Sequence, residues 1–319
     1  MKKEKIIIDT DPGVDDTTAL IFALNNKHID IKLITTVSGN VGIKHATRNA
    51  CHIIDLFGKD IPVVKGASKP LARPAIHASY LHGQQGMGGY TPPQDTIHKP
   101  LECDVADKMY QVIMDNPHEI TIFVWGPQTN IAHLLTKHPD SKNYIKQIIF
   151  MGGCPYGIEG FPNHDSFNIK SDPEAFQVVL DTQIPLKMLP SHIGRYKVGL
   201  NEADVTQVAQ HGIIGKFLAK TYQGYLEPDM LEQGLKIVAT NDTSALFCHI
   251  YPKIFTVKKA NLIVDTKKNI GRTYIDFCEY GAIEIVTDVD IPKFKKLFFD
   301  NIDKIQNSMI NTDLLKIKD

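Results

Sequence analysis

Short apolar runs alternate along the first two thirds of the chain with longer segments in which apolar residues recur at helical spacing. The apolar runs predict strands at Lys5–Ile8, Ile31–Val37, Pro62–Val64, Ile120–Val124, Gln147–Phe150 and Leu186–Leu189. The amphipathic segments predict helices at Asp15–Asn25, Ile43–Phe57, Asp104–Asn116, Asn130–Thr136 and Pro173–Leu180. Continuous apolar strands separated by helices are typical of a mostly parallel sheet that is buried on both faces. We therefore expect an α/β protein with a central sheet flanked by helices.

The last third of the chain has a different pattern. Asn201–Gly234 predicts a helical region, Ile254–Val289 predicts short strands and turns, and Pro292–Met309 predicts an amphipathic C-terminal helix. No repeat, low-complexity tract or linker divides the sequence, and α/β sheets often reach this size as one unit. We expect one domain that spans residues 1–319.

Polar and Gly-rich residues follow several of the predicted strands. These residues are Asp9–Asp16, Ser38-Gly39-Asn40, Gly126-Pro127 and Gly152-Gly153. In open parallel sheets, ligands bind at the carboxyl ends of the strands. The segment Lys65–Pro100 is rich in Gly, Pro and His without periodicity, and loops of that length tend to be functional. The sequence thus predicts an active site at the carboxyl ends of the strands.

Composition narrows the class of partner. The 35 Lys and Arg residues against 36 Asp and Glu residues give a net charge of −1, without long blocks of one sign. This balance argues against a nucleic-acid or membrane surface and favours a small-molecule partner. No apolar stretch has the length of a signal peptide or a membrane span. The five cysteines are scattered without a CxxC pair, so we expect reduced thiols and a cytoplasmic location.

The most unusual feature is a cluster of four acids, Asp9, Asp11, Asp15 and Asp16, directly behind the first apolar run. One or two of these acids would suit the start of a helix, where the dipole is positive. Four carboxylates without a basic residue between them favour a site for a hard cation such as Ca²⁺ or Mg²⁺. Asp11 and Asp16 are expected to reach one ion, whereas Asp15 is expected to point elsewhere on the helix.

Three later residues are further candidates on local pattern alone, and two of them have two readings. Asn40 ends a strand and is either a turn residue or an amide that contacts a ligand. Trp125 precedes Gly126-Pro127 at another strand end, which directs its carbonyl toward the same edge of the sheet. Asp242 lies before a helical run and is either a helix cap or a further carboxylate ligand.

The order of these motifs resembles the inosine-uridine nucleoside hydrolase family over nearly the whole chain. The motifs that carry the resemblance are DTDPGVDD at 9–16, Ser38-Gly39-Asn40, His82-Gly83, GPQTNIA at 126–132, Met151-Gly152-Gly153, Phe167-Asn168 and Asp172-Pro173-Glu174-Ala175. The resemblance implies Ca²⁺-dependent hydrolysis of a ribonucleoside to ribose and free base. It also implies a homodimer or homotetramer.

The resemblance assigns roles to individual residues. Asp11 is implied to be both a ligand of the ion and the base that accepts a proton from the attacking water. The other implied ligands are the carboxylates of Asp16 and Asp242 and the carbonyl of Trp125. The implied contacts to the substrate come from Asp15, Asn40, His82, Met151 and Asn168. An all-oxygen set suits Ca²⁺ better than Zn²⁺.

Two positions depart from the pattern of the family. Ser166 stands where a Glu holds the ribose 5′-hydroxyl, and Asp165 or Asn163 are candidate substitutes. Asn241 stands where many members have a His that protonates the leaving base, so at this catalytic position Asn241 is limited to hydrogen bonding. The candidates for stacking on the base are Trp125, Tyr80, Tyr222 and Tyr225, and the candidate donors are His82, His164 and His192.

Two alternative functions remain open at this point. Asp9-Thr10-Asp11 also fits the aspartyl-phosphate site of a Mg²⁺ phosphatase, although the later acidic pair of such a site is missing. The changes at Ser166 and Asn241 alternatively fit a nucleoside-binding protein without turnover.

Overall fold

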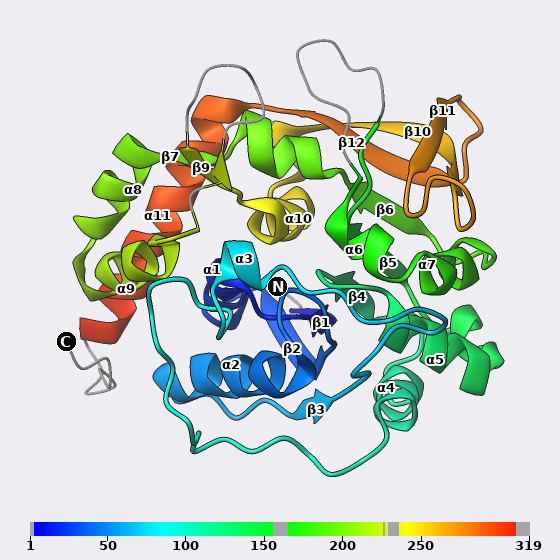
Figure 1. Ribbon diagram of the computed structural model, residues 1–319, viewed down its shortest axis with the longest axis horizontal. Coiled ribbons are helices and arrows are strands. Elements are labelled where there is room, and N and C mark those ends of the chain that lie inside the picture. The colour runs from blue at the N-terminus through cyan, green and yellow to red at the C-terminus, as the bar shows by residue number, and fades with distance from the viewer. Residues whose placement is uncertain (1–2, 156–164, 226, 229–235, 311–319) are drawn as a thin grey trace.

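The computed structural model describes residues 3–155, 165–225, 227–228 and 236–310. A nine-stranded sheet with the order β11-β10-β12-β6-β5-β4-β1-β2-β3 forms its centre (Figure 1). The seven strands from β12 to β3 pair in parallel, and β10 and β11 continue the sheet as antiparallel strands. The strands are β1 (Glu4–Thr10), β2 (Ile29–Thr36), β3 (Val63–Lys65), β4 (Thr121–Val124), β5 (Gln147–Met151), β6 (Leu186–Leu189), β10 (Phe255–Val264), β11 (Thr273–Phe277) and β12 (Ile283–Val289).

Helices cover both faces of this sheet. Successive residues of a strand point to opposite faces, so Ile6 and Ile8 join one hydrophobic core and Ile7 joins the other. The first core packs against α1 (Val14–Leu24), α2 (Ile43–Leu56), α9 (Gly212–Tyr222), α10 (Asn241–Ile250) and α11 (Ile291–Ile310). The second core packs against α4 (Val105–Met114), α5 (Thr129–Lys137) and α7 (Pro173–Leu180). The sheet is therefore the middle of three layers, which confirms the predicted fold class.

The shorter elements are α3 (Ser79–His82), α6 (Phe167–Ser171), α8 (Glu202–Ala209), η1 (Pro139–Asn143), η2 (Ile193–Lys197) and η3 (Pro252–Ile254). A second, antiparallel sheet of three strands has the order β7-β9-β8, with β7 (Leu200–Asn201), β9 (Lys236–Val238) and β8 (Glu227–Pro228). In Figure 1, α8, α9 and α11 gather on the side of the molecule opposite α4, α5 and α7.

The periodicity predicted the first two thirds of the chain well, because its strands are continuously buried. Each predicted strand and helix there is present, with ends that shift by two residues at most. The prediction for Asn201–Gly234 was wrong at both edges of its described part. Asn201 belongs to β7 and residues 227–228 form β8, since both segments pair with β9. The strands predicted within Ile254–Val289 are present. One of them, β12, pairs with β6 and extends the main sheet.

Asn130 fastens three of the segments at the carboxyl ends of the strands. Its amide nitrogen donates to Asp9 Oδ1 at 2.7 Å and to the carbonyl of Thr36 at 3.0 Å, and its Oδ1 accepts from the N–H of Ala67 at 2.9 Å. The Asn130 side chain is fully buried. Its hydrogen bonds therefore connect β1, β2 and the loop after β3, and water has no access to them.

Replacing Asn130 by Ala is expected to lower the free energy of unfolding by about 2–4 kcal/mol, because three buried polar groups lose their partner. Urea denaturation followed by circular dichroism measures this change. Asn261→Ala, at an exposed position on β10, serves as the control. Equal midpoints for the two variants would contradict the role given to Asn130.

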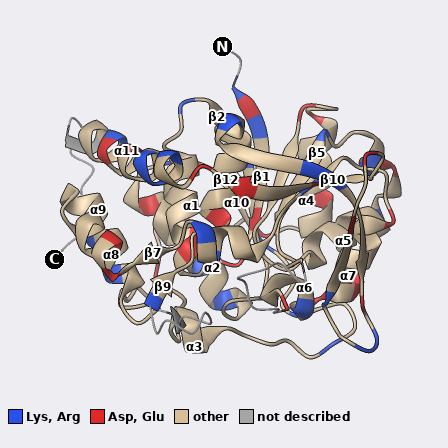
Figure 2. Cartoon of the chain, turned by 90° about the horizontal axis from the view of Figure 1, so that it is seen from above, with Lys and Arg blue, Asp and Glu red and all other residues tan. Residues whose placement is uncertain are grey.

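In the view of Figure 2, basic and acidic positions are interspersed over the described part of the chain. Within the described ranges, no helix is both long and apolar enough to span a membrane.

Candidate active site

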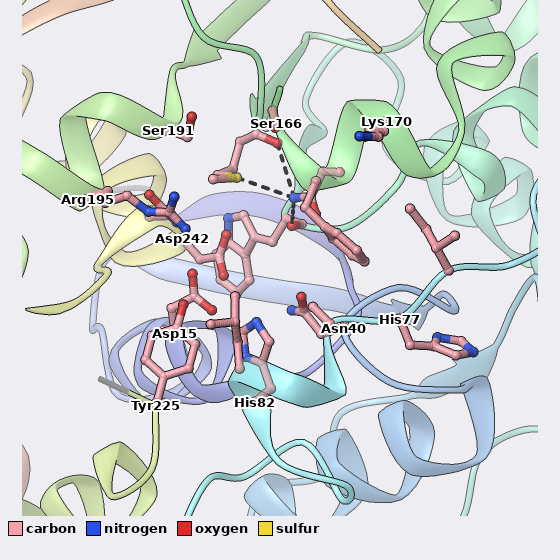
Figure 3. A pocket seen from close by; sticks show the side chains of 18 of the residues that line it. Asp15, Asn40, His77, His82, Ser166, Lys170, Ser191, Arg195, Tyr225 and Asp242 are labelled. Carbon is pink, nitrogen blue, oxygen red and sulfur yellow. Dashed lines mark hydrogen bonds between the residues drawn. The ribbon is translucent and has the colours of Figure 1, made fainter. Parts of the chain in front are cut away.

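A pocket of about 450 Å³ opens where the predicted polar segments meet (Figure 3). Its wall includes Asp15 at the start of α1, Asn40 after β2, Trp125 after β4 and Met151 at the end of β5. The loop Lys65–Pro100 contributes residues 76–78 and 80–82. Parallel strands bring their carboxyl ends to one edge of a sheet, so segments far apart in sequence converge here.

Three buried carboxylates lie at the inner end of the pocket. One oxygen each of Asp15, Asp16 and Asp242 lies within 4.8 Å of the other two, which is close enough to hold one metal ion. Asp242 is the second residue of α10 and Thr240 is the helix cap, so the capping reading of Asp242 was wrong. The expectation that Asp15 points away from Asp16 was also wrong. Both carboxylates come from the first turn of α1 and lie within 4.8 Å of each other, and Asp15 lines the pocket.

Asp11 lies beside this cluster on the segment between β1 and α1. Its Oδ2 accepts the backbone N–H of Asn40 at 2.6 Å, and the Asn40 side-chain amide donates to Asp16 Oδ2 at 3.0 Å. Asn40 therefore positions two of the acids and is more than a turn residue. Gly39 allows the close approach, since a Cβ atom there would lie 1.9 Å from Asp11 Oδ2. Asp11 Oδ1 is buried without a hydrogen-bond partner in the described part of the chain.

The electrostatics of the cluster favour a bound cation. Burial raises the pKa of Asp11 well above its usual range, and the charges of Asp16 and Asp15 raise it further. Burial likewise raises the pKa of Asp242, together with repulsion from Asp15, Asp16 and Asp11. Asp16 has a pKa raised by burial, although hydrogen bonds from Thr10 and Gly13 oppose the shift. A divalent ion would remove this mutual repulsion.

Asn168 connects the ends of two neighbouring strands. Its side-chain nitrogen donates to the carbonyl of Trp125, and it lies 3.3 Å from both the carbonyl oxygen and the Sδ atom of Met151. Asn168 is buried at the start of α6 and lines the pocket. The amide thus fixes the direction of the Trp125 carbonyl, which the sequence predicts as a ligand of the ion.

Replacing Asn168 by Ala is expected to weaken the binding of a divalent cation at the acidic cluster by about 10–100-fold, because a positioning group for that carbonyl is lost. Calorimetric titration with Ca²⁺ and with Mg²⁺ measures the change. Asn261→Ala again serves as the control. An unchanged cation affinity would contradict the link between Asn168 and the carbonyl.

His82 closes the pocket from α3. Its Nδ1 accepts the backbone N–H of Val14 at 3.1 Å, so the proton of the neutral ring is on Nε2. Burial lowers the pKa of His82 to about 3, and the positive charge of Arg195 contributes. The ring of Tyr225 lies 4.8 Å from the imidazole, centroid to centroid. His82 is therefore a neutral hydrogen-bond donor at neutral pH.

The remaining candidates divide between pocket and core. Asn241, Ser166, Asp165, Tyr80 and Tyr225 line the pocket, and Trp125 lines it while packing against Phe123. Tyr222 is buried with its hydroxyl 2.9 Å from that of Thr18, so it is not available for stacking on a base. His192 is buried and is not part of the pocket wall. Asn163 and His164 lie outside the described residues.

Sequence reasoning missed several residues of the pocket wall, among them Lys170, Ser191 and Arg195. Lys170 lies on α6, which is too short for a periodic signal. Ser191 and Arg195 lie between β6 and β7, where η2 is a single turn of π-helix. Such turns are frequent at functional sites but have no sequence pattern of their own.

The fold and the site define an α/β protein with a cluster of carboxylates that could hold a cation at the carboxyl ends of its parallel strands. The model of the "Inosine-uridine preferring nucleoside hydrolase" family matches residues 6–296. The non-specific ribonucleoside hydrolase RihC of Escherichia coli (strain SE11) is 31% identical over 297 residues, which cover 91% of this chain and 95% of that protein. The chain belongs to this nucleoside hydrolase family.

Solved structures give the same result. The purine-preferring ribonucleoside hydrolase from Gardnerella vaginalis matches with a TM-score of 0.85 and 27% identity, covering 95% of this chain and 99% of that one. The plant nucleoside hydrolase PpNRh1 matches with a TM-score of 0.83 and 27% identity, covering 94% and 98%. The predicted family and enzyme class, a hydrolase acting on N-glycosyl compounds, are confirmed. The phosphatase alternative was wrong, and Asp9 is instead buried against Thr35 and Asn130.

Proposed function

We propose that this protein hydrolyses the N-glycosidic bond of a ribonucleoside to ribose and free base, with Ca²⁺ as its cofactor. One observation carries the proposal: a buried acidic cluster borders a pocket of nucleoside size in a chain of this family.

Asp16 and Asp242 of the cluster, together with the neighbouring Asp11, fit a calcium ion. We assign the carboxylates of Asp11, Asp16 and Asp242 and the carbonyl of Trp125 as its protein ligands. Asp11 Oδ1 and Asp242 Oδ1 are both buried without a hydrogen-bond partner among the described residues. Atoms that coordinate a cation are expected to have this environment. Hard oxygen donors without His or Cys suit Ca²⁺.

Ca²⁺ would orient the ribose hydroxyls and lower the pKa of the attacking water. Asp11 would accept the proton of that water, because its carboxylate combines a raised pKa with a position beside the cluster. Asp15 and Asn40, which line the pocket, would bind the ribose hydroxyls. Met151 and Asn168 would contact the sugar from the end of β5 and the start of α6.

The proposal is tested by incubating the purified protein with inosine, guanosine, adenosine, uridine and cytidine in calcium buffer. Liquid chromatography measures the free base, and a reducing-sugar assay measures ribose. We expect both products in equal amounts from at least one nucleoside. Binding by calorimetry without base release over hours would favour the alternative of a nucleoside-binding protein.

We make three further predictions, on the domain organisation, the location and the assembly of the protein. We infer that its 319 residues form one domain, that it acts in the cytoplasm and that it assembles as a homodimer or homotetramer. Light scattering of the purified protein measures the assembly state.

A further inference from the structure

Taking the proposed hydrolysis as given, we propose that Arg195 stabilises the negative charge of the departing base, the task left open by Asn241. Cleavage of the glycosidic bond leaves its electron pair on a nitrogen of the base. The water oxygen adds to C1′, and Asp11 takes one proton of that water. The base leaves as an anion beside the guanidinium group and then takes a proton from solvent, so that ribose and neutral base result.

Asn241 and His82 do not suit the protonation of the base. Asn241 cannot lose a proton, and its side chain lines the pocket with Oδ1 unpartnered among the described residues. His82 is held neutral, because its Nδ1 accepts from Val14 and burial lowers the pKa of the ring to about 3. A permanent positive charge near the base would favour its departure.

Arg195 lies on the side of the pocket where Asp242 and the acidic cluster lie. It lines the pocket, and Figure 3 shows its side chain entering from the side of Asp242, opposite His77 and Lys170. Its charge also contributes to the lowered pKa of His82, which places the guanidinium within electrostatic reach of that ring. The rings of His82 and Tyr225, which are tilted by 46° to each other, give this part of the pocket an aromatic surface for a heterocycle.

The backbone fixes Arg195 relative to the catalytic end of α10. The carbonyl of Gly194 accepts the N–H of Thr240 at 3.0 Å and its hydroxyl at 3.2 Å. A Cβ atom at Gly194 would lie 2.5 Å from the Cα atom of Asn241, so only Gly permits this contact. Arg195, Asn241 and Asp242 therefore come from two segments that are packed against each other. Movement of one relative to the other is restricted.

Arg195 and Lys170 carry the permanent positive charges among the described residues of the pocket wall. Lys170 lies on α6 and its side chain is drawn on the opposite side from Arg195 in Figure 3. A charge that does not line the pocket gives the matched control: Lys197→Met removes an equal charge from the same helical turn as Arg195, where Lys197 pairs with Asp288 at 2.6 Å.

The test compares inosine with p-nitrophenyl β-D-riboside, whose leaving group is a stable anion that needs no help. We expect R195M to lower kcat for inosine by about 10²–10³-fold and kcat for the nitrophenyl riboside by less than about 10-fold. R195K is expected to recover part of the loss for inosine, and K197M to retain the activity of the unmodified protein with both substrates.

Equal losses for the two substrates in R195M, or no loss for inosine, would overturn the assignment. Thermal melting checks the fold of each variant, and if R195M is unfolded, R195K and R195Q provide the same comparison. Failure of the unmodified protein to release a leaving group from either substrate would instead overturn the proposed function. The two failures are therefore distinguishable.

Discussion

Replacing Asp11 by Asn is expected to lower kcat for ribonucleoside hydrolysis by about 10³-fold or more, because the substitution removes the proposed base and weakens the ion site together. The shape of the side chain is retained, so Oδ1 of the new amide still accepts from Asn40 in one orientation. Steady-state release of base from the best nucleoside measures the effect. KM is expected to change much less, since Asp15, Asn40 and Asn168 remain.

Asp30→Asn is the control for this experiment. Asp30 lies on β2 and does not line the pocket. Its carboxylate lies 2.8 Å from Nζ of Lys32. The variant loses the same charge and is expected to keep full activity. Activity of Asp11→Asn within 10-fold of the unmodified protein would contradict the role of Asp11 as base.

The sequence was sufficient to predict the framework of the site. Ile6-Ile7-Ile8 is apolar on both faces, which is a requirement for a central parallel strand and not for an edge strand. Once β1 is central, Asp11 and Asp16 must follow at the carboxyl end of the sheet. Helical spacing then fixed α1 and α2 to within a residue or two, because each buries a full apolar face.

The rest of the site depends on contacts between segments that are distant in sequence. The local sequence pattern does not predict such contacts. Asp15 turns toward Asp242 because α1 packs against α10, a contact across more than 220 residues of sequence. Arg195 reaches the pocket only because Gly194 packs against Asn241. The register of β12 beside β6 was equally hidden, since an antiparallel hairpin reads the same wherever it docks.

Removal of divalent ions is expected to abolish base release and to lower the melting temperature, by about 5 °C when Ca²⁺ is otherwise present at 100 times its dissociation constant. The cause is the repulsion between Asp11, Asp16 and Asp242, which the ion neutralises. Differential scanning fluorimetry with EDTA, Ca²⁺ or Mg²⁺ measures the shift, and Ca²⁺ is expected to give the larger one. Coincident melting curves in EDTA and Ca²⁺ would contradict a calcium site.

The pH dependence of the metal-free protein provides a second, independent result. The pKa values of Asp11 and Asp242 are raised by burial, so the folded chain binds more protons than the unfolded chain above about pH 4. The contribution of these two carboxylates to the stability of the metal-free protein therefore falls as pH rises from that value toward neutral. Asp242→Asn removes one buried charge and is expected to raise the stability of the metal-free protein at pH 8 by about 1–3 kcal/mol. The same variant is expected to lose the increase in melting temperature on addition of Ca²⁺, because Asp242 is one of the proposed ligands of the ion.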